Sequence, residues 1–200
     1  MKVQVKEGKE VKEFDLIKSW SDVTLETWLK LVDFESKTKS EQAQVTIETL
    51  SNIPHTVINK LELSDVGAIM SAIGRLQKDQ NKILKRIIEI EGKEYGFHPD
   101  LDSITLGEYA DLETFIKQGI EGNLPEVMAI LYRPIVDKKG DLYRIEPYDG
   151  NLKMRAEEMK KMSAEQVQSA MVFFWIFVHE LLMILPSSLM QQLKGMTTQN

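Results

Sequence analysis

The chain of 200 residues contains no cysteine. Disulfide bridges, thiolate nucleophiles and cysteine-ligated zinc are therefore excluded. Histidine is also scarce: His55, His98 and His179 are far apart and show neither HExxH nor another paired metal-binding spacing. The GxGxxG and GxxxxGK(S/T) phosphate-binding loops and the GxSxG nucleophile motif are missing as well. These absences predict a non-enzymatic protein with no catalytic, cofactor-binding or metal-ligating residues.

Positive charge is the scarcer sign, since 25 Lys and Arg residues against 31 Asp and Glu residues give a formal net charge of -6. Nucleic-acid binding depends on clustered Lys and Arg at the phosphates, so we expect no nucleic-acid partner. A hydrophobic content of 42% with 28% charged residues is ordinary for a folded globular chain. The first residues show no apolar stretch of the kind found in a secretory signal, and the lack of cysteine is compatible with an intracellular product.

Long apolar runs are absent except for AMVFFWIFVHELLMIL at residues 170–185, which only His179 and Glu180 interrupt. A membrane-spanning helix needs about 20 mostly apolar residues, and a carboxylate inside the bilayer is costly. The run therefore predicts a helix buried in the core or against another protein chain. Peripheral attachment of residues 170–190 to a membrane stays open as the alternative.

Helical spacing of apolar residues alternates along the chain with short hairpin signals around Gly turns. Hairpins are expected at residues 3–14, 87–97 and 135–145. Helices are expected at about residues 22–32, 41–50, 54–61, 64–78, 104–119, 123–132 and 151–162. A long apolar helix should follow, begun by a capping box from Ser163 to Gln166 and ended or kinked by Pro186. The sequence thus predicts a mainly α fold with small β-hairpins (α+β), as one helical bundle-like domain over residues 1–200.

Three short sequence matches recur in the same order along the chain. They are EGKE at residues 7–10 and 91–94, VTL and ITL at residues 23–25 and 104–106, and NIP and NLP at residues 52–54 and 123–125. A duplication would give sub-repeats at residues 1–80 and 84–145, followed by a C-terminal helical segment at residues 149–195. Matches this short also arise by chance, so a chain without a duplication stays open.

A structural cluster is expected around Arg133, Tyr148 and Asp149. Arg133 precedes Pro134, which holds its backbone extended, so the guanidinium can point consistently at a carboxylate. Tyr148 and Asp149 belong to a turn whose aromatic ring could cover that ion pair. We expect these residues to fix the third hairpin against the helices. A ligand-facing Arg133 is the alternative.

Glu108 and Asp111 are spaced to share one face of a helix, as a general acid/base or metal-binding pair would. A metal-dependent enzyme built on these two carboxylates is therefore a third hypothesis. The favoured interpretation is a solvated acidic face opposite the apolar side of the same helix.

The C-terminal third carries an excess of adaptable apolar side chains. Eight of the ten methionines lie between Met128 and Met196, and thioether side chains are common at surfaces that repack against partners. The aromatic residues that follow point to all sides of a helix, so such a helix is either central in the core or shared with another chain. The expected partner-binding residues are Met171, Phe173, Phe174, Trp175, Phe177 and Met183.

Several short motifs together resemble small helical proteins encoded in the structural and tail-assembly gene blocks of tailed bacteriophages that infect gut bacteria. The motifs are ITLGEY at residues 104–109, LYRP at residues 131–134, PYD at residues 147–149 and FF at residues 173–174. The resemblance covers roughly residues 20–185. It implies a tail assembly chaperone or a minor virion component, with other phage structural or tail proteins as partners. A homo-oligomer and a location in the virion or the infected host's cytoplasm are the accompanying expectations.

Overall fold

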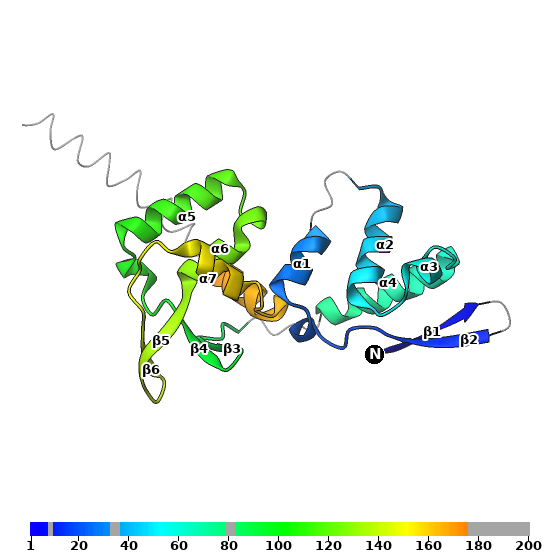
Figure 1. Ribbon diagram of the computed structural model, residues 1–200, viewed down its shortest axis with the longest axis horizontal. Coiled ribbons are helices and arrows are strands. Elements are labelled where there is room, and N and C mark those ends of the chain that lie inside the picture. The colour runs from blue at the N-terminus through cyan, green and yellow to red at the C-terminus, as the bar shows by residue number, and fades with distance from the viewer. Residues whose placement is uncertain (8–9, 33–36, 79–82, 176–200) are drawn as a thin grey trace, which may run out of the picture.

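The structure is a computed structural model that describes residues 1–7, 10–32, 37–78 and 83–175 (Figure 1). The α+β fold predicted from the sequence is confirmed. The helices are α1 (Leu25–Val32), α2 (Lys39–Leu50), α3 (His55–Ile58), α4 (Leu63–Lys78), α5 (Leu106–Gln118), α6 (Leu124–Leu131), α7 (Leu152–Met159) and a further helix over residues 164–175. Short 3-10 turns occupy Trp20–Asp22, Leu101–Ser103 and Glu121–Asn123.

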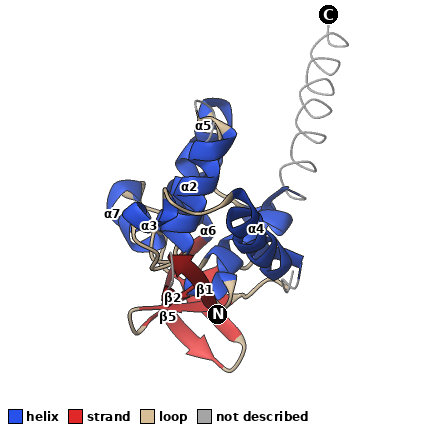
Figure 2. Cartoon of the chain, turned by 90° about the vertical axis from the view of Figure 1, so that its right-hand side faces the viewer, coloured by secondary structure: helices blue, strands red, loops and turns tan. Residues whose placement is uncertain are grey.

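The strands of the described residues form two antiparallel sheets. β1 (Lys2–Glu7) pairs with β2 (Glu10–Asp15), and β3 (Ile87–Ile90), β4 (Lys93–Phe97), β5 (Tyr132–Lys139) and β6 (Leu142–Ile145) follow in that order in the second sheet. All three predicted hairpins are present. Gly92 and Gly140 occupy their turns with positive φ angles of 80° and 61°, which glycine adopts without strain. Seen from the end of the molecule, both sheets lie on the same side of the helices (Figure 2).

Buried apolar side chains of the described residues gather in two clusters. One joins the β1–β2 hairpin to α2 and α4 through residues such as Val5, Ile47 and Ile69. The other joins the four-stranded sheet to α5, α6, α7 and residues 164–175. Trp28 on α1 packs against both clusters.

Backbone hydrogen bonds join the two buried clusters beside the start of the last described helix. The N–H of Ala164 donates to the carbonyl of Val23 at 2.7 Å, and the N–H of Leu25 donates to the carbonyl of Met162 at 2.7 Å. The expected capping box is also present, because Gln166 N–H donates to Ser163 Oγ at 3.2 Å and Ser163 N–H donates to Gln166 Oε1 at 3.0 Å. The helix over residues 164–175 is thus fixed at its start by its own capping box and by the backbone of residues 23–25.

Two of the three recurring sequence matches fall on elements of the same kind: Thr24 and Thr105 each precede a helix, and residues 52–54 and 123–125 both lie where a helix begins. In the third match, residues 91–92 form the β3–β4 turn, but residues 8–9 lie outside the described residues. The halves differ in their sheets, however, because β4 pairs onward with β5 whereas β1–β2 is a separate hairpin. The duplication stays a hypothesis.

Gly96 on β4 is required by close packing, and its replacement by alanine should destabilise the protein. A Cβ at this position would lie 2.6 Å from Cδ2 of Tyr143 and 2.8 Å from Cγ2 of Ile145. Overpacking of this kind costs about 1–3 kcal/mol of unfolding free energy, which urea unfolding measures. Gly74→Ala on α4 is the matched control, because nothing lies within 4 Å of its Cβ position. An equal effect of the two substitutions would contradict the packing argument.

Candidate functional site

A buried polar cluster begins at the first turn of α5. Thr105 caps this helix in a capping box, in which its N–H and hydroxyl donate to Oε2 of Glu108 at 2.8 and 2.6 Å. The Glu108 side chain is thereby turned back into the protein, where it is only 1% exposed. The favoured assignment of Glu108 to a solvated acidic face is wrong, because the capping box and a buried cation hold the carboxylate inside.

The cation is Arg133, whose side chain projects from β5 immediately after α6. Its Nη2 lies 2.7 Å from Oε1 of Glu108, and the residue is 4% exposed. His98, which follows β4, brings Nε2 within 3.5 Å of the same oxygen. No motif in the sequence marks His98, but its backbone N–H donates to the carbonyl of Leu131 at 2.7 Å and its side chain is buried. The β4–β5 pairing therefore assembles the cluster.

Tyr148 and Asp149 tie the segment after β6 to two different helices. The Arg133 guanidinium carbon lies 5.9 Å from the centre of the Tyr148 ring, and the Tyr148 hydroxyl donates to the carboxylate of Asp111 on α5. Asp149 accepts a hydrogen bond from Arg155 on α7 at 3.1 Å rather than pairing with Arg133. Both carboxylates of the proposed Glu108 and Asp111 enzyme pair are thus engaged by protein groups.

The charge states in this cluster follow from its burial and its partners. Burial alone would raise the pKa of Glu108, but the hydrogen bonds from Thr105 and the charge of Arg133 lower it below its usual value. Burial lowers the pKa of His98, and the nearby charge of Glu108 opposes this shift. At neutral pH the cluster therefore holds a charged carboxylate, a charged guanidinium and a neutral imidazole. The ion pair between Glu108 and Arg133 joins α5 to β5, which is a structural role.

Acidification should destabilise the protein partly through His98, and His98→Gln should weaken that dependence. In the unfolded chain the imidazole gains its proton near the ordinary histidine pKa of 6.5, whereas in the folded protein it does so only at lower pH. The stability that neutral His98 contributes is fully present above the unfolded pKa of 6.5 and is lost as the pH falls through the lowered folded pKa. Urea unfolding between about pH 7 and pH 5 tests this. A wild-type pH profile for His98→Gln would contradict the prediction.

The second candidate site is on the helix over residues 164–175. Val167, Ala170 and Phe174 are fully buried in the core along one face. Val172, Phe173 and Trp175 are exposed by 43%, 39% and 49%. With half-buried Met171, these three residues form what we call the C-terminal apolar face. Phe174 was expected to contact a partner, but its side chain is buried in the core and is not available to one. The expected partner-binding residues Phe177 and Met183 lie outside the described residues.

A groove adjoins this face, between residues 164–175, α1 and the start of α6. It has a volume of 250 Å³, and we call it the tryptophan groove. It is lined by Trp28, Ile120, Glu121, Leu124, Gln168, Met171, Val172 and Trp175. Sequence reasoning missed the contributions of Trp28 and Ile120, because only the tertiary fold brings these distant segments beside Trp175.

The described residues contain no group of three or more acidic or histidine side chains that could hold a metal ion. Nor does any helix in the described part of the chain combine the length and apolar character needed to cross a bilayer. A comparison of the chain with protein-family models, curated proteins and solved structures finds no match.

Proposed function

We propose that the protein acts by binding another protein through the tryptophan groove and the adjoining C-terminal apolar face. The observation that carries this proposal is Trp175, a large apolar residue that is 49% exposed beside the exposed Val172 and Phe173 on the same helix. Trp is the residue type most enriched at the energetic centres of protein interfaces. A partner that covered this half-exposed side chain would remove further apolar surface from water.

The chemistry of the groove favours a protein over a small ligand. Its volume of 250 Å³ is below the roughly 300–1,000 Å³ of pockets that enclose small molecules. Six of its eight lining residues are apolar, and the polar exceptions are Glu121 and Gln168. An apolar centre with a few polar side chains beside it is the usual composition of a protein interface.

Within this proposal, the partner is another structural or tail protein of a bacteriophage, and the protein is a tail assembly chaperone or a minor virion component. This part rests on the resemblance carried by the motifs at residues 104–109, 131–134, 147–149 and 173–174. Mass spectrometry of purified particles separates the two roles. A virion component is present at fixed stoichiometry, whereas a chaperone is absent from mature particles.

Replacing Trp175 with serine should abolish partner binding without unfolding the protein. The experiment is affinity purification of the tagged full chain from the cells that produce it, with quantitative mass spectrometry. Leu142→Ser is the matched control, since Leu142 is 78% exposed in β6, away from the groove. We expect a protein that co-purifies with wild type and Leu142→Ser and falls about tenfold or more with Trp175→Ser. Equal recovery of the co-purifying protein with all three chains would contradict the proposal. It would also be contradicted if the wild-type chain floated with liposomes and Trp175→Ser did not.

A further inference from the structure

Among the residues that the structure describes, the β1–β2 hairpin has one edge that is covered and one that is open. Met1 and Leu16 exchange two backbone hydrogen bonds, of 2.5 and 2.6 Å. Residues in an antiparallel ladder alternate between pairs that bond to each other and pairs whose backbone groups point away. The register pairs Val3 with Phe14 and Lys2 with Asp15. The N–H and C=O groups of Lys2 and Gln4 therefore point outward from the free edge of β1.

The opposite edge, on β2, is already occupied. Asp15 N–H donates to the side-chain oxygen of Asn52 at 2.7 Å, and Asn52 N–H donates to the Asp15 carbonyl at 3.0 Å. Leu16 and Ser51 continue this contact as a β-bridge. On the β1 side, no described residue is hydrogen-bonded to the outward backbone groups of Lys2 or Gln4. These groups are available to an added strand.

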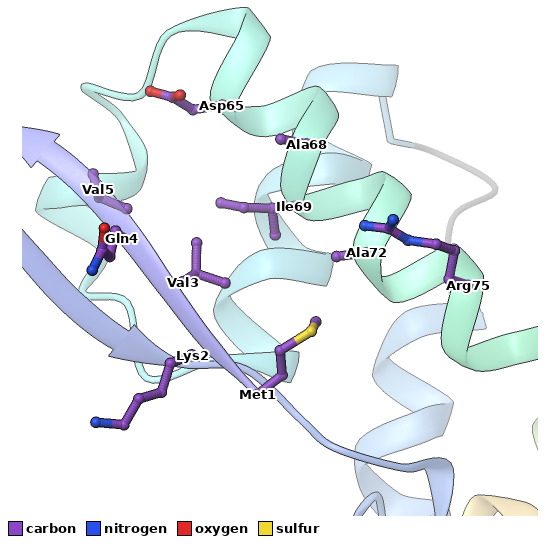
Figure 3. Close-up of a pocket in the computed structure, with 10 residues that line it drawn as sticks. All are labelled: Met1, Lys2, Val3, Gln4, Val5, Asp65, Ala68, Ile69, Ala72 and Arg75. Carbon is purple, nitrogen blue, oxygen red and sulfur yellow. The ribbon is translucent and has the colours of Figure 1, made fainter.

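A groove of 240 Å³ runs along this open edge, between β1 and α4 (Figure 3). Its lining includes five consecutive residues, Met1 to Val5. Because successive side chains of a strand point to opposite faces, a cavity that touches all five lies against the strand's edge rather than one of its faces. The other wall is a single stripe of α4, formed by Asp65, Ala68, Ile69, Ala72 and Arg75.

The groove has the dimensions of a short extended segment. The α4 stripe covers ten helical steps, or about 15 Å, which equals four to five residues of extended chain at about 3.3 Å each. Ala68 and Ala72 present only methyl groups in the middle of the wall, so a backbone has room beside them. Val3 and Ile69 make the floor apolar.

Opposite charges stand at the two ends of the groove. Figure 3 shows Arg75 toward the Met1 end of β1 and Asp65 toward the Val5 end. A strand that runs antiparallel to β1 begins near Asp65 and ends near Arg75. A basic residue at its start and an acidic residue at its end would therefore each meet an opposite charge.

We propose that this groove binds an extended segment of a partner protein, which adds to β1 as an antiparallel third strand. The segment has four or five residues, alternating small or β-branched apolar side chains with polar ones. A basic residue precedes the segment and an acidic residue ends it. Its backbone bonds to Lys2 and Gln4, as in other recognition by strand addition. This site is separate from the tryptophan groove and does not depend on the function proposed there.

The test selects random heptapeptides from a display library on the full chain and titrates the best fluorescent peptide. Gln4→Pro removes an outward N–H without breaking the β1–β2 ladder, a position where an edge strand tolerates proline. Glu13→Pro is the matched control, because Glu13 pairs with Gln4 and points its own N–H toward the other edge. Both variants are first checked for wild-type circular dichroism and thermal unfolding. We expect Gln4→Pro to weaken binding about tenfold and Glu13→Pro to change it less than about twofold.

Two further measurements fix the mode of binding. Bound peptide should slow hydrogen exchange at the Lys2 and Gln4 amides, and Arg75→Glu should prefer a peptide whose acidic end is changed to lysine. The proposal is overturned if no peptide is enriched, or if the peptides bind Gln4→Pro as tightly as wild type. It is also overturned if the two amides become protected by raising the protein concentration alone, since a second copy would then be the occupant. Trp175→Ser should leave peptide binding unchanged, so failure here and failure of the proposed function are distinguishable.

Discussion

Replacing Glu108 with alanine should lower the free energy of unfolding by about 3–5 kcal/mol, as expected when one partner of a buried ion pair is removed. The substitution leaves the Arg133 guanidinium 4% exposed without its counter-charge, which lay 2.7 Å away. It also removes the carboxylate that accepts two hydrogen bonds from Thr105 at the start of α5. Urea unfolding at neutral pH measures the loss.

Glu113 on the same helix provides the control for this prediction. Its ion pair with Lys117 joins side chains exposed by 46% and 71%, so Glu113→Ala should cost no more than about 1 kcal/mol. The double variant Glu108→Leu with Arg133→Met should be less destabilised than the sum of its single variants, because no buried charge is left unpaired. Strict additivity of the two substitutions would contradict a coupled ion pair.

Replacing Phe174 with alanine should destabilise the protein by about 3–5 kcal/mol, whereas Trp175→Ala should change stability by no more than about 1 kcal/mol. Phe174 is fully buried among the residues that join the sheet to α6 and α7. Trp175, the next residue, is 49% exposed, and its ring meets that of Phe174 edge-on at 5.9 Å. The two neighbouring aromatic residues are therefore expected to have different roles.

Thermal or urea unfolding of both variants measures this contrast directly. Trp175→Ala is predicted to keep a wild-type unfolding curve and to lose partner binding, while Phe174→Ala loses stability first. If Trp175→Ala were as destabilising as Phe174→Ala, Trp175 would be a core residue and could not serve as the centre of a binding surface.

The hairpins and helices could be predicted because their signals are local. Gly92 marks a turn between alternating strands, Ser163 and Gln166 form a capping box, and Pro125 opens α6. Each signal involves residues within a few positions of one another, so the sequence alone contains it. The pairing of β4 with β5 has no such signal, since it joins residues almost forty positions apart. Because this pairing was not predicted, the burial of His98 beside Arg133 was not predicted either.

The candidate sites were only partly predictable for the same reason. The extended backbone before Pro134 indicates that Arg133 has a fixed direction, but its partner Glu108 was assigned to solvent because its helical spacing also fits an acidic face. A run of apolar residues predicts that the helix at 164–175 is buried, yet cannot tell Phe174 from Trp175 before the packing partners are known. The groove along β1 depends on which edge Asn52 covers, and this is a tertiary contact.

Site-specific photocrosslinking shows whether the C-terminal apolar face meets another protein chain, on which the proposed function depends. Val172, which is 43% exposed and lines the tryptophan groove, is replaced by the photoreactive aromatic amino acid p-benzoylphenylalanine in the full chain, so that Trp175 is kept. Leu142 is replaced in the same way as the control, inside the cells that produce the protein. We expect a discrete adduct with another protein, or with a second copy of this chain, from position 172 and none from position 142. If position 172 gives no adduct, or the same adducts as position 142, the protein does not bind a partner through this surface.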